Sequence, residues 1–373
     1  MSQPREVHEA TLCAPYNLLM LKLGGITLAL VSVLGLTLAA CAPVEITPAK
    51  VTYTESPPTE RTYAPEPPAD PRPAVAWPLT GIDAAAATPE QLALPAISVK
   101  IPNDSHARPQ TNLEFADNVF EEYVEAGIPR LIGVFHSQIP ETVGPIRSMR
   151  EMDPYIIGQL GGPLVFSGAN KNVMTASRNT GQFLIAQDLG DSGYFRTKDK
   201  PSPYNLHITM AEMIEQSIGL VAPAPQYAFA YPSEAATATL YGTPASHIDL
   251  RFSKYGEPSW DWDAATNTWL RSEFGEPDVT AAGVRLSATN VVVLHVAVHF
   301  NWGLPVSNMI VNNSPGYVAT GGKYIPILWS KTDRTAPYVF STVDGKPVEL
   351  APGQTWFELV PNAGVSGTHA NFS

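Results

Sequence analysis

The segment Asn290–Phe300 reads NVVVLHVAVHF and is the strongest β-strand of the sequence. Its valines are β-branched, and such residues favour the extended backbone of a strand. Gly and Pro turns such as Asp344-Gly345 and Pro352-Gly353 separate the apolar segments that follow. We expect these further strands at Tyr324–Trp329, Tyr338–Phe340 and Thr355–Val360. The sequence therefore predicts a β-rich C-terminal half over residues 229–362, followed by a tail over residues 363–373.

Upstream of residue 229, predicted strands alternate with predicted helices. Ile97–Ile101 alternates apolar and polar residues, as a half-buried strand does. A capping box formed by Thr111 and Glu114 predicts the start of a helix that runs to about Glu125. Further buried strands are predicted at Leu131–Phe135 and Leu164–Phe166, and further helices at Asp153–Leu160 and Asn205–Ile218.

The predicted fold class is mixed α/β, or α+β. An α/β N-terminal half over residues 91–228 would pack with the β-rich C-terminal half. A chain of 373 residues with 44% hydrophobic residues can bury a core of that size. The net charge of −12 argues against binding nucleic acid, which requires a basic surface, and against a polybasic attachment to anionic lipid.

An export signal is predicted near the N-terminus. The apolar run Leu23–Leu38 follows Lys22 and ends in Leu-Ala-Ala-Cys41. The run is shorter than the roughly twenty residues that span a membrane, although a plain transmembrane anchor or an ordinary cleaved signal remains an alternative. The segment resembles a bacterial lipoprotein signal, which is cut before the cysteine whose thiol then carries a diacylglycerol. The resemblance implies an extracytoplasmic protein that a lipid on Cys41 attaches to the cell membrane.

The boundaries of this region follow from its composition. Residues 1–40 form the predicted signal, and translation from Met20 would make residues 1–19 an extension that is not part of the protein. Ten prolines fall between Pro43 and Pro78, and such a composition favours extended polyproline conformations over a core. We therefore predict a tether over residues 41–90. Apart from Cys41 the only cysteine is Cys13, so no disulfide framework or metal cluster is expected.

Candidate binding residues gather between Asn103 and Arg150. Three carboxylates recur at helical spacing, and four arginines lie near them in the sequence. The carboxylates are Asp117, Glu121 and Glu125, and the arginines are Arg108, Arg130, Arg147 and Arg150. One interpretation is a structural lattice of arginine–carboxylate pairs, because unpaired buried charge is costly. The other is a ligand site in which Asn103 and the carboxylates orient the arginines.

The leading functional hypothesis is a non-catalytic protein that binds an anionic cell-wall ligand or an envelope partner. Arg147 and Arg150 precede the helix expected at Asp153, and Gly144-Pro145 fixes their loop. The planar guanidinium group suits carboxylate and phosphate, and a helix N-terminus adds to the attraction. The alternatives are a cell-wall hydrolase or transferase that uses Glu121 or Glu125 as acid or base, and a purely structural partner of another envelope protein.

Other residues with chemical potential carry weaker predictions. His295 and His299 share one face of a strand but lie roughly 13 Å apart, too far for one metal ion. Asp104-Ser105-His106 contains triad residue types, but adjacent residues cannot form that geometry. Three tryptophans could stack on sugar rings, although packing in the core is favoured; they are Trp260, Trp262 and Trp269. We expect neither a metal ion nor a cofactor.

A family resemblance rests on motifs that fall in order along residues 95–361. They include Ala107-Arg-Pro-Gln110, Gly144-Pro-Ile-Arg-Ser-Met-Arg150, Pro203-Tyr-Asn-Leu206, Trp329-Ser-Lys331, Asp344-Gly-Lys346 and Pro352-Gly-Gln-Thr-Trp356. In these motifs the chain resembles the YerB-like lipoproteins of bacteria. The resemblance implies a two-part fold and an envelope location but no established reaction. Tyr204 and Phe166 stand where this family commonly has histidine, so a catalytic scheme based on those histidines does not carry over.

Overall fold

A computed structural model describes residues 70–373 of the chain. The predicted signal, Cys41 and most of the predicted tether lie outside the described residues. Within the described part, no helix is long and apolar enough to cross a membrane. The described residues 70–373 form one compact unit. Leu79, Thr80 and Ala84 are buried in it, so the packed unit includes residues that we assigned to the tether.

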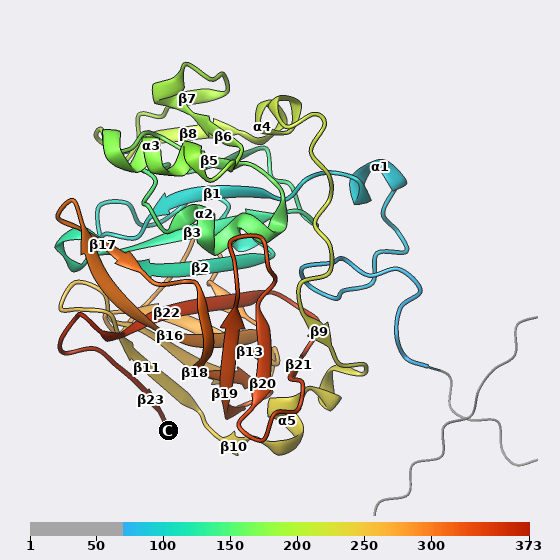
Figure 1. The fold of residues 1–373 in the computed structure, drawn as a ribbon. Coiled ribbons are helices and arrows are strands. Elements are labelled where there is room, and N and C mark those ends of the chain that lie inside the picture. The colour runs from blue at the N-terminus through green and yellow to red at the C-terminus, as the bar shows by residue number, and fades with distance from the viewer. Residues whose placement is uncertain (1–69) are drawn as a thin grey trace, which may run out of the picture. The chain divides into compact units, whose positions relative to one another are not determined.

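A twelve-stranded mixed sheet forms the centre of this unit, in the order β10-β19-β18-β16-β22-β2-β3-β1-β5-β6, with β17 paired to β16 and β20 to β19. Its strands are β1 (Ile97–Pro102), β2 (Asn118–Tyr123), β3 (Pro129–Phe135), β5 (Leu164–Phe166), β6 (Leu184–Ala186), β10 (Thr243–Pro244), β16 (Asn290–Asn301), β17 (Leu304–Ser307), β18 (Val311–Thr320), β19 (Lys323–Lys331), β20 (Val339–Thr342) and β22 (Thr355–Ala363). Strand β22 lies between β16 and β2 and runs parallel to both. One sheet therefore joins the two predicted halves, as β2 and β22 show in Figure 1.

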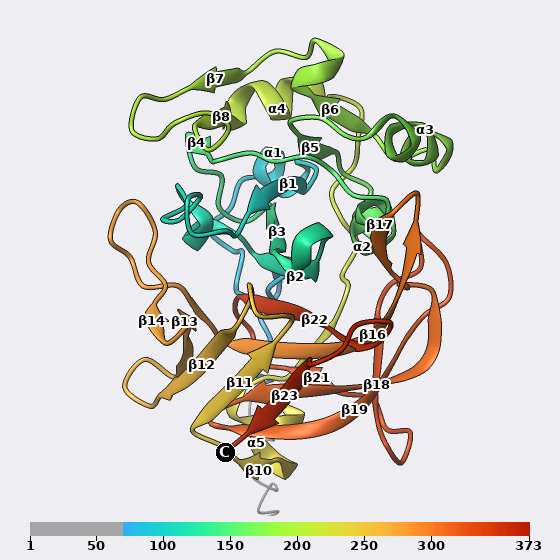
Figure 2. The same ribbon diagram turned by 90° about the vertical axis from the view of Figure 1, so that its left-hand side faces the viewer.

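A second, six-stranded sheet packs on one face of the large sheet. It contains β11 (His247–Arg251), β12 (Pro258–Asp263), β13 (Thr268–Glu273), β14 (Glu276–Pro277), β15 (Ser287–Ala288) and β23 (His369–Phe372). Figure 2 shows β11, β12 and β23 in front of and beside the large sheet. Trp260 and Trp269 are fully buried between the sheets, with the Trp260 ring 5.2 Å from that of Trp356. Core packing is thus confirmed for these two tryptophans, and the segment predicted as a tail supplies β23.

The remaining elements are short. The helices are α1 (Pro89–Leu92), α2 (Asp153–Ile157), α3 (Lys171–Asn179), α4 (Met210–Gln216) and α5 (Thr237–Tyr241), and the small sheets use β4 (Thr142–Val143), β7 (Tyr194–Arg196), β8 (Leu206–Thr209), β9 (Ala228–Phe229) and β21 (Glu349–Leu350). Strand accounts for 40% of the structure and helix for 15%. The mixed sheet confirms part of the predicted fold class, but helices make up a small share of the structure, and those of the N-terminal half are short.

The predicted helix from Thr111 to Glu125 is wrong. A single 3₁₀ turn, Leu113–Phe115, follows Asn112, whose side chain makes no capping hydrogen bond, and the chain then enters β2. Neighbouring side chains of a strand point to opposite faces. Glu121 and Glu122 therefore lie on opposite faces of the large sheet. Both are fully buried. The acidic residues matched a helical spacing by coincidence, and their burial hid the alternation by which a strand is recognised.

Two smaller predictions also need correction. Strand β1 is present, but it is buried throughout, and Lys100, which we expected on a solvated face, is 0% exposed. The helix predicted over Asn205–Ile218 begins only at Met210, because Leu206–Thr209 pairs with β4 and β7 as strand β8. The strands predicted around Leu131, Leu164, Asn290 and Thr355 are confirmed by the structure.

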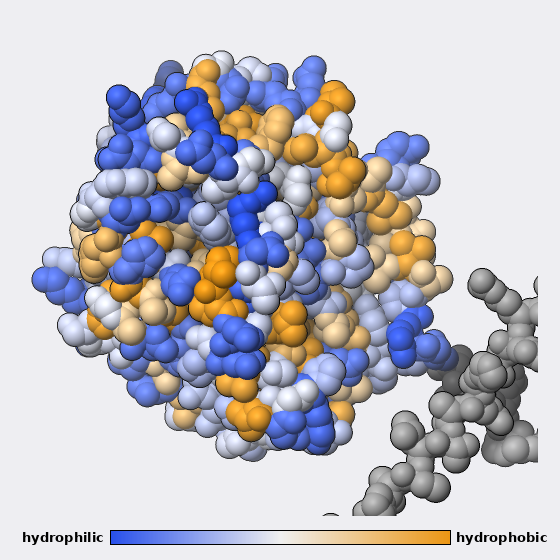
Figure 3. Space-filling view, viewed as in Figure 1, coloured by the Kyte–Doolittle hydropathy of each residue, from blue (hydrophilic) through white to orange (hydrophobic). Residues whose placement is uncertain are grey.

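The outer face of the unit that Figure 3 shows is a mixture of hydrophilic and apolar side chains. Apolar groups gather there in small areas between hydrophilic ones. Scattered apolar side chains of this kind are ordinary on protein surfaces. The apolar groups on this face therefore do not mark a candidate site.

Candidate functional site

The eight predicted site residues do not form one site. Successive side chains of β2 point to opposite faces, so Glu121 points toward the second sheet and Glu122 toward α2. Asn103, Arg108 and Glu121 accordingly lie in a network with residues of β13. Glu125, Arg130 and Arg150 form a second cluster. Asp117 and Arg147 lie apart from both.

Arg271, on β13, is the centre of the first network and is 0% exposed. Its guanidinium group donates hydrogen bonds to Glu121 Oε2 at 2.7 Å, to Glu273 Oε2 at 2.8 Å and to Asp278. It also lies 5.0 Å from the centre of the Trp356 ring. The sequence analysis missed Arg271, because nothing local distinguishes a buried arginine in a strand from a solvated one.

Asn103 completes the polar shell of this network. Its amide nitrogen donates to Glu121 Oε1 at 2.9 Å and to Glu273 Oε2 at 3.1 Å. Gln110 in turn donates to the amide oxygen of Asn103 at 3.3 Å. We expected Asn103 to orient the predicted arginines, but its amide nitrogen instead contacts the carboxylates around Arg271.

Glu358 adds a further carboxyl group to the network. It pairs with Glu121 across the parallel strands β2 and β22, and both side chains are fully buried. Burial and the neighbouring Glu121 raise the pKa of Glu358, and burial also raises the pKa of Glu121. The indole nitrogen of Trp260 donates to Glu358 Oε1 at 2.9 Å. This pair is therefore a buried contact between β2 and β22 at which burial disfavours the ionised carboxylates.

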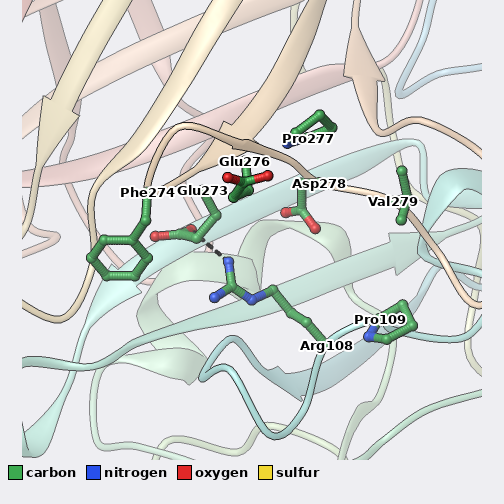
Figure 4. A pocket seen from close by; sticks show the side chains of 8 residues that line it. All are labelled: Arg108, Pro109, Glu273, Phe274, Glu276, Pro277, Asp278 and Val279. Carbon is green, nitrogen blue, oxygen red and sulfur yellow. Dashed lines mark ion pairs between the residues drawn. The ribbon is translucent and has the colours of Figure 1, made fainter.

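A pocket of about 320 Å³ lies at the edge of the same network. Figure 4 shows Arg108 extending across it toward Glu273, with Nη1 3.7 Å from Oε2. Glu276 and Asp278 also line the pocket. Three carboxylates around one arginine make the pocket acidic, so it is a poor place for an anion.

The second cluster is a compact ion lattice at the end of β2. Glu125 accepts hydrogen bonds from Arg130 Nη2 at 3.0 Å, from Arg150 Nε at 2.6 Å and from Arg150 Nη2. Both arginines also donate to the carbonyl oxygen of Ser148. Burial and the nearby Arg147 lower the pKa of Arg130 to about 10. Because these guanidinium groups already have partners, their geometry favours the lattice interpretation for Arg130, Arg150 and Glu125.

Lys100, Glu122 and Asp153 form a neighbouring buried triad that the sequence analysis did not predict. Lys100 Nζ donates to Glu122 and to Asp153 Oδ1 at 3.0 Å, and the Lys100 and Glu122 side chains are fully buried. Asp153 Oδ2 accepts the backbone N–H of Arg150 at 2.8 Å. Burial and the charge of Asp153 raise the pKa of Glu122 to about 8. The triad ties α2 to the centre of the sheet.

Asp117 has a structural task. Its carboxylate accepts the backbone N–H groups of His136 at 2.7 Å and Ser137 at 2.8 Å, and also the Ser137 hydroxyl. Burial raises the pKa of Asp117 to about 6, although these hydrogen bonds oppose the rise. The residue fixes the turn that follows β3.

Arg147 differs from the other predicted arginines. Its guanidinium carbon lies 5.1 Å from the centre of the Tyr204 ring, a cation–π contact. Among residues 70–373, no carboxylate lies within 4.0 Å of its guanidinium nitrogens. Its backbone is held on both sides, because its N–H donates to Lys100 O at 2.9 Å and its carbonyl accepts from Ser167 N–H at 2.9 Å. The side chain is thus half-buried and positioned, but its charge is not balanced.

Arg147 lines a cavity of about 290 Å³ between the loop Ile146–Ser148 and the segments on either side of it. Arg196 and Asp188 are its other charged lining residues. Arg196 Nη1 donates to Asn205 Oδ1 at 2.9 Å, which leaves the other guanidinium N–H groups for a ligand. Ser148, Ser167 and Gln187 contribute polar groups. The cavity therefore combines two arginines with polar groups that can bind an anion.

The two positions where histidine was expected have different roles here. The Tyr204 ring lies under Arg147 and stacks on His106 with their centres 5.5 Å apart. Phe166 is fully buried, and its carbonyl accepts the Tyr194 hydroxyl at 2.9 Å. Neither aromatic ring can transfer a proton as an imidazole does. Within the described residues, His, Cys, Asp and Glu side chains form no group of three that could hold a metal ion.

Comparisons with known proteins agree with one another. A family model described as "Protein of unknown function (DUF3048) N-terminal domain" matches residues 79–219, and the model of its C-terminal domain matches residues 248–357. The "Putative lipoprotein YerB" of Bacillus subtilis (strain 168) is 24% identical over 303 residues, which cover 76% of this chain and 86% of that protein. A crystal structure of YerB from Bacillus subtilis matches with a TM-score of 0.69 and 21% identity, over 80% of this chain and 99% of that one. At this identity the structural match shows a shared fold.

Proposed function

The chain belongs to the YerB-like family of lipoproteins, and from this premise we propose that its globular part binds an anionic ligand of the cell envelope around Arg147. The proposal rests on Arg147, whose guanidinium group has no carboxylate partner among residues 70–373. A half-buried guanidinium group interacts with a ligand more strongly than one in bulk water, because the surrounding dielectric constant is lower. Its planar donors suit a carboxylate or a phosphate group.

The pairing of the candidate carboxylates supports binding rather than catalysis. Glu121 is fully buried and held by Arg271 and Asn103. Glu125 accepts from two arginines. A general acid or base must reach the substrate, which the burial of Glu121 prevents, and Glu125, although partly exposed, is engaged by two arginines. The hydrolase or transferase hypothesis is therefore the weaker of the two.

Replacing Arg147 by Gln is expected to weaken anion binding tenfold or more, because a charged hydrogen-bonding partner contributes roughly 1.5–3 kcal/mol. The probes are N-acetyl-alanine, which presents a carboxylate, and glycerol 3-phosphate, which presents a phosphate. Titration calorimetry on the intact, detergent-solubilised protein gives the affinities for both probes. The thermal unfolding temperature should stay close to that of the wild type, because Arg147 makes no ion pair within the described residues.

The matched control is Arg178→Gln. Arg178 is exposed on α3 and does not line the cavity. Arg178→Gln removes one positive charge, as Arg147→Gln does. Any general electrostatic effect on anion affinity therefore appears in both variants. Equal affinities for the wild type and both variants would rule out a site at Arg147. Unfolding of Arg147→Gln would instead show that the residue is structural.

We also propose that Cys41 carries the lipid that attaches the protein to the outer face of the membrane. The support is the apolar run that ends in Leu-Ala-Ala-Cys41 and the lipoprotein relative. In cells, Cys41→Ala is expected to move the protein from the membrane fraction to the aqueous fraction on detergent phase separation. Ser56→Ala, in the predicted tether, is the control and should leave the distribution unchanged. Retention of the Cys41→Ala protein in the detergent phase would contradict lipidation.

A further inference from the structure

The cavity around Arg147 contains one acidic side chain, Asp188, in addition to Arg147 and Arg196. Asp188 is exposed, and it forms no ion pair within 4.0 Å among residues 70–373. Opposite charges that share a small cavity normally approach one another. Here they stay farther apart than an ion pair, although all three side chains line the same cavity of about 290 Å³.

The position of Asp188 depends on a glycine beneath it. A Cβ atom on Gly168 would lie only 2.0 Å from Asp188 Oδ2, so the carboxylate occupies the space that any other residue would fill. The backbone also holds both residues in place. The N–H of Asp188 donates to Ser167 O at 3.3 Å, and the N–H of Met149 donates to Gly168 O at 2.9 Å. The carboxylate is therefore seated on the cavity lining and not simply directed into solvent.

Resting on the function proposed above, we infer that the ligand is a zwitterion whose head group carries an anionic group and a primary ammonium group. The anionic group binds Arg147 and Arg196, and the ammonium group binds Asp188. An ammonium group has three donors and no acceptor, which matches a carboxylate without a partner. A ligand with only negative charge would be attracted by the arginines but repelled by Asp188.

Two chemical sources supply such a head group. One is a free α-amino acid, and the other is an aminoalkyl phosphate. Alanine and O-phosphoethanolamine represent them. N-acetyl-alanine and glycerol 3-phosphate are their counterparts without the ammonium group. Comparing the two pairs by titration calorimetry separates the contribution of the ammonium group from that of the anion.

We expect at least one zwitterion to bind about fivefold more tightly than its counterpart, the size of a partly exposed ion pair. Asp188→Asn should abolish this preference and leave the affinity for the counterpart equal or higher. Glu215→Gln, which removes a negative charge from the exposed side of α4, should keep the preference. The pair of compounds that shows the larger preference for the zwitterion identifies the chemical source of the head group.

The outcomes separate the two proposals. If both members of each pair bind equally, and Arg147→Gln weakens them all, the zwitterion inference is wrong and the anion site stands. If a preference exists but persists in Asp188→Asn, the assignment of Asp188 is wrong. If none of the four compounds binds at millimolar concentration, or if Arg147→Gln binds them as the wild type does, both proposals fail.

Discussion

Replacing Arg271 by Met is expected to lower the free energy of unfolding by about 3–5 kcal/mol, the usual cost of removing one partner from a buried ion pair. Arg271 is fully buried and donates to Glu121, Glu273 and Asp278. A methionine would fill much of its volume but would leave these carboxylates without their cation. They would have to take up protons or admit water, and both responses cost free energy in the native state.

Urea denaturation followed by tryptophan fluorescence measures this loss, because Trp260 and Trp356 lie beside Arg271. Arg178→Met, on the exposed surface of α3, is the control and should change the free energy of unfolding by less than about 0.5 kcal/mol. If Arg271→Met does not fold, Arg271→Lys keeps the charge and should give a smaller, measurable loss. A loss below about 1 kcal/mol in Arg271→Met would contradict the central role of the network.

Replacing Lys100 by Met is expected to cost about 3 kcal/mol, because it removes the cation between Glu122 and Asp153. The loss should grow as the pH rises above about 8. Burial and Asp153 already raise the pKa of Glu122 to about 8, so at lower pH this carboxyl group holds a proton and needs the lysine less. Above that pH it is ionised in the wild type, and without Lys100 its charge has no partner. Urea denaturation at pH 6 and pH 9 gives the comparison.

Glu122→Gln tests the same triad from the other side. The native-state pKa of Glu122 lies above the ordinary value of 4.5, so the native protein keeps a proton that the unfolded chain releases. The stability from this group is therefore complete below pH 4.5 and is lost as the pH rises toward about 8. Glu122→Gln cannot titrate and should remove this part of the pH dependence. An unchanged pH profile in this variant, or a pH-independent loss in Lys100→Met, would contradict the account of the triad.

Much of the strand framework could be predicted because its information is local. Asn290–Phe300 is rich in apolar, β-branched residues, and β16 covers this whole predicted segment and extends to Asn301. Leu131–Phe135 and Thr355–Val360 behave in the same way in β3 and β22. Apolar strands are recognisable from a few neighbouring residues because burial and backbone preference agree there.

The failures occurred where charged residues are buried. NVFEEY, residues 118–123, forms the central strand β2, yet the acidic residues Asp117, Glu121 and Glu125 fitted a helical spacing. Lys100 had a different effect, because β1 was recognised as a strand but its polar face was expected to be solvated. A buried charge violates the local pattern of a strand, and it is tolerated only because a partner from elsewhere in the chain compensates it. No window of sequence contains that partner.

The candidate site shows the same division. The sequence identified Arg108, Arg130, Arg147 and Arg150 as a group, because they lie close together and their residue type suits anions. The sequence could not distinguish the arginines that pair with a carboxylate from Arg147, which pairs with none among the described residues. Glu125 lies five residues from Arg130 and 25 from Arg150. The cavity that Arg147 shares with Asp188 and Arg196 is lined by several segments that are separated in the sequence between residues 146 and 206.

By itself, then, the sequence determined the strong strands, the predicted export signal that ends at Cys41 and the set of charged residues in which a site could lie. Only the tertiary structure decided which charges are neutralised. Arg271 meets Glu121 across 150 residues of chain, and Lys100 meets Asp153 across 53. The physical reason is that the cost of burying a charge depends on its partner in space, whereas the preference of a residue for strand or helix depends mainly on its neighbours in the chain.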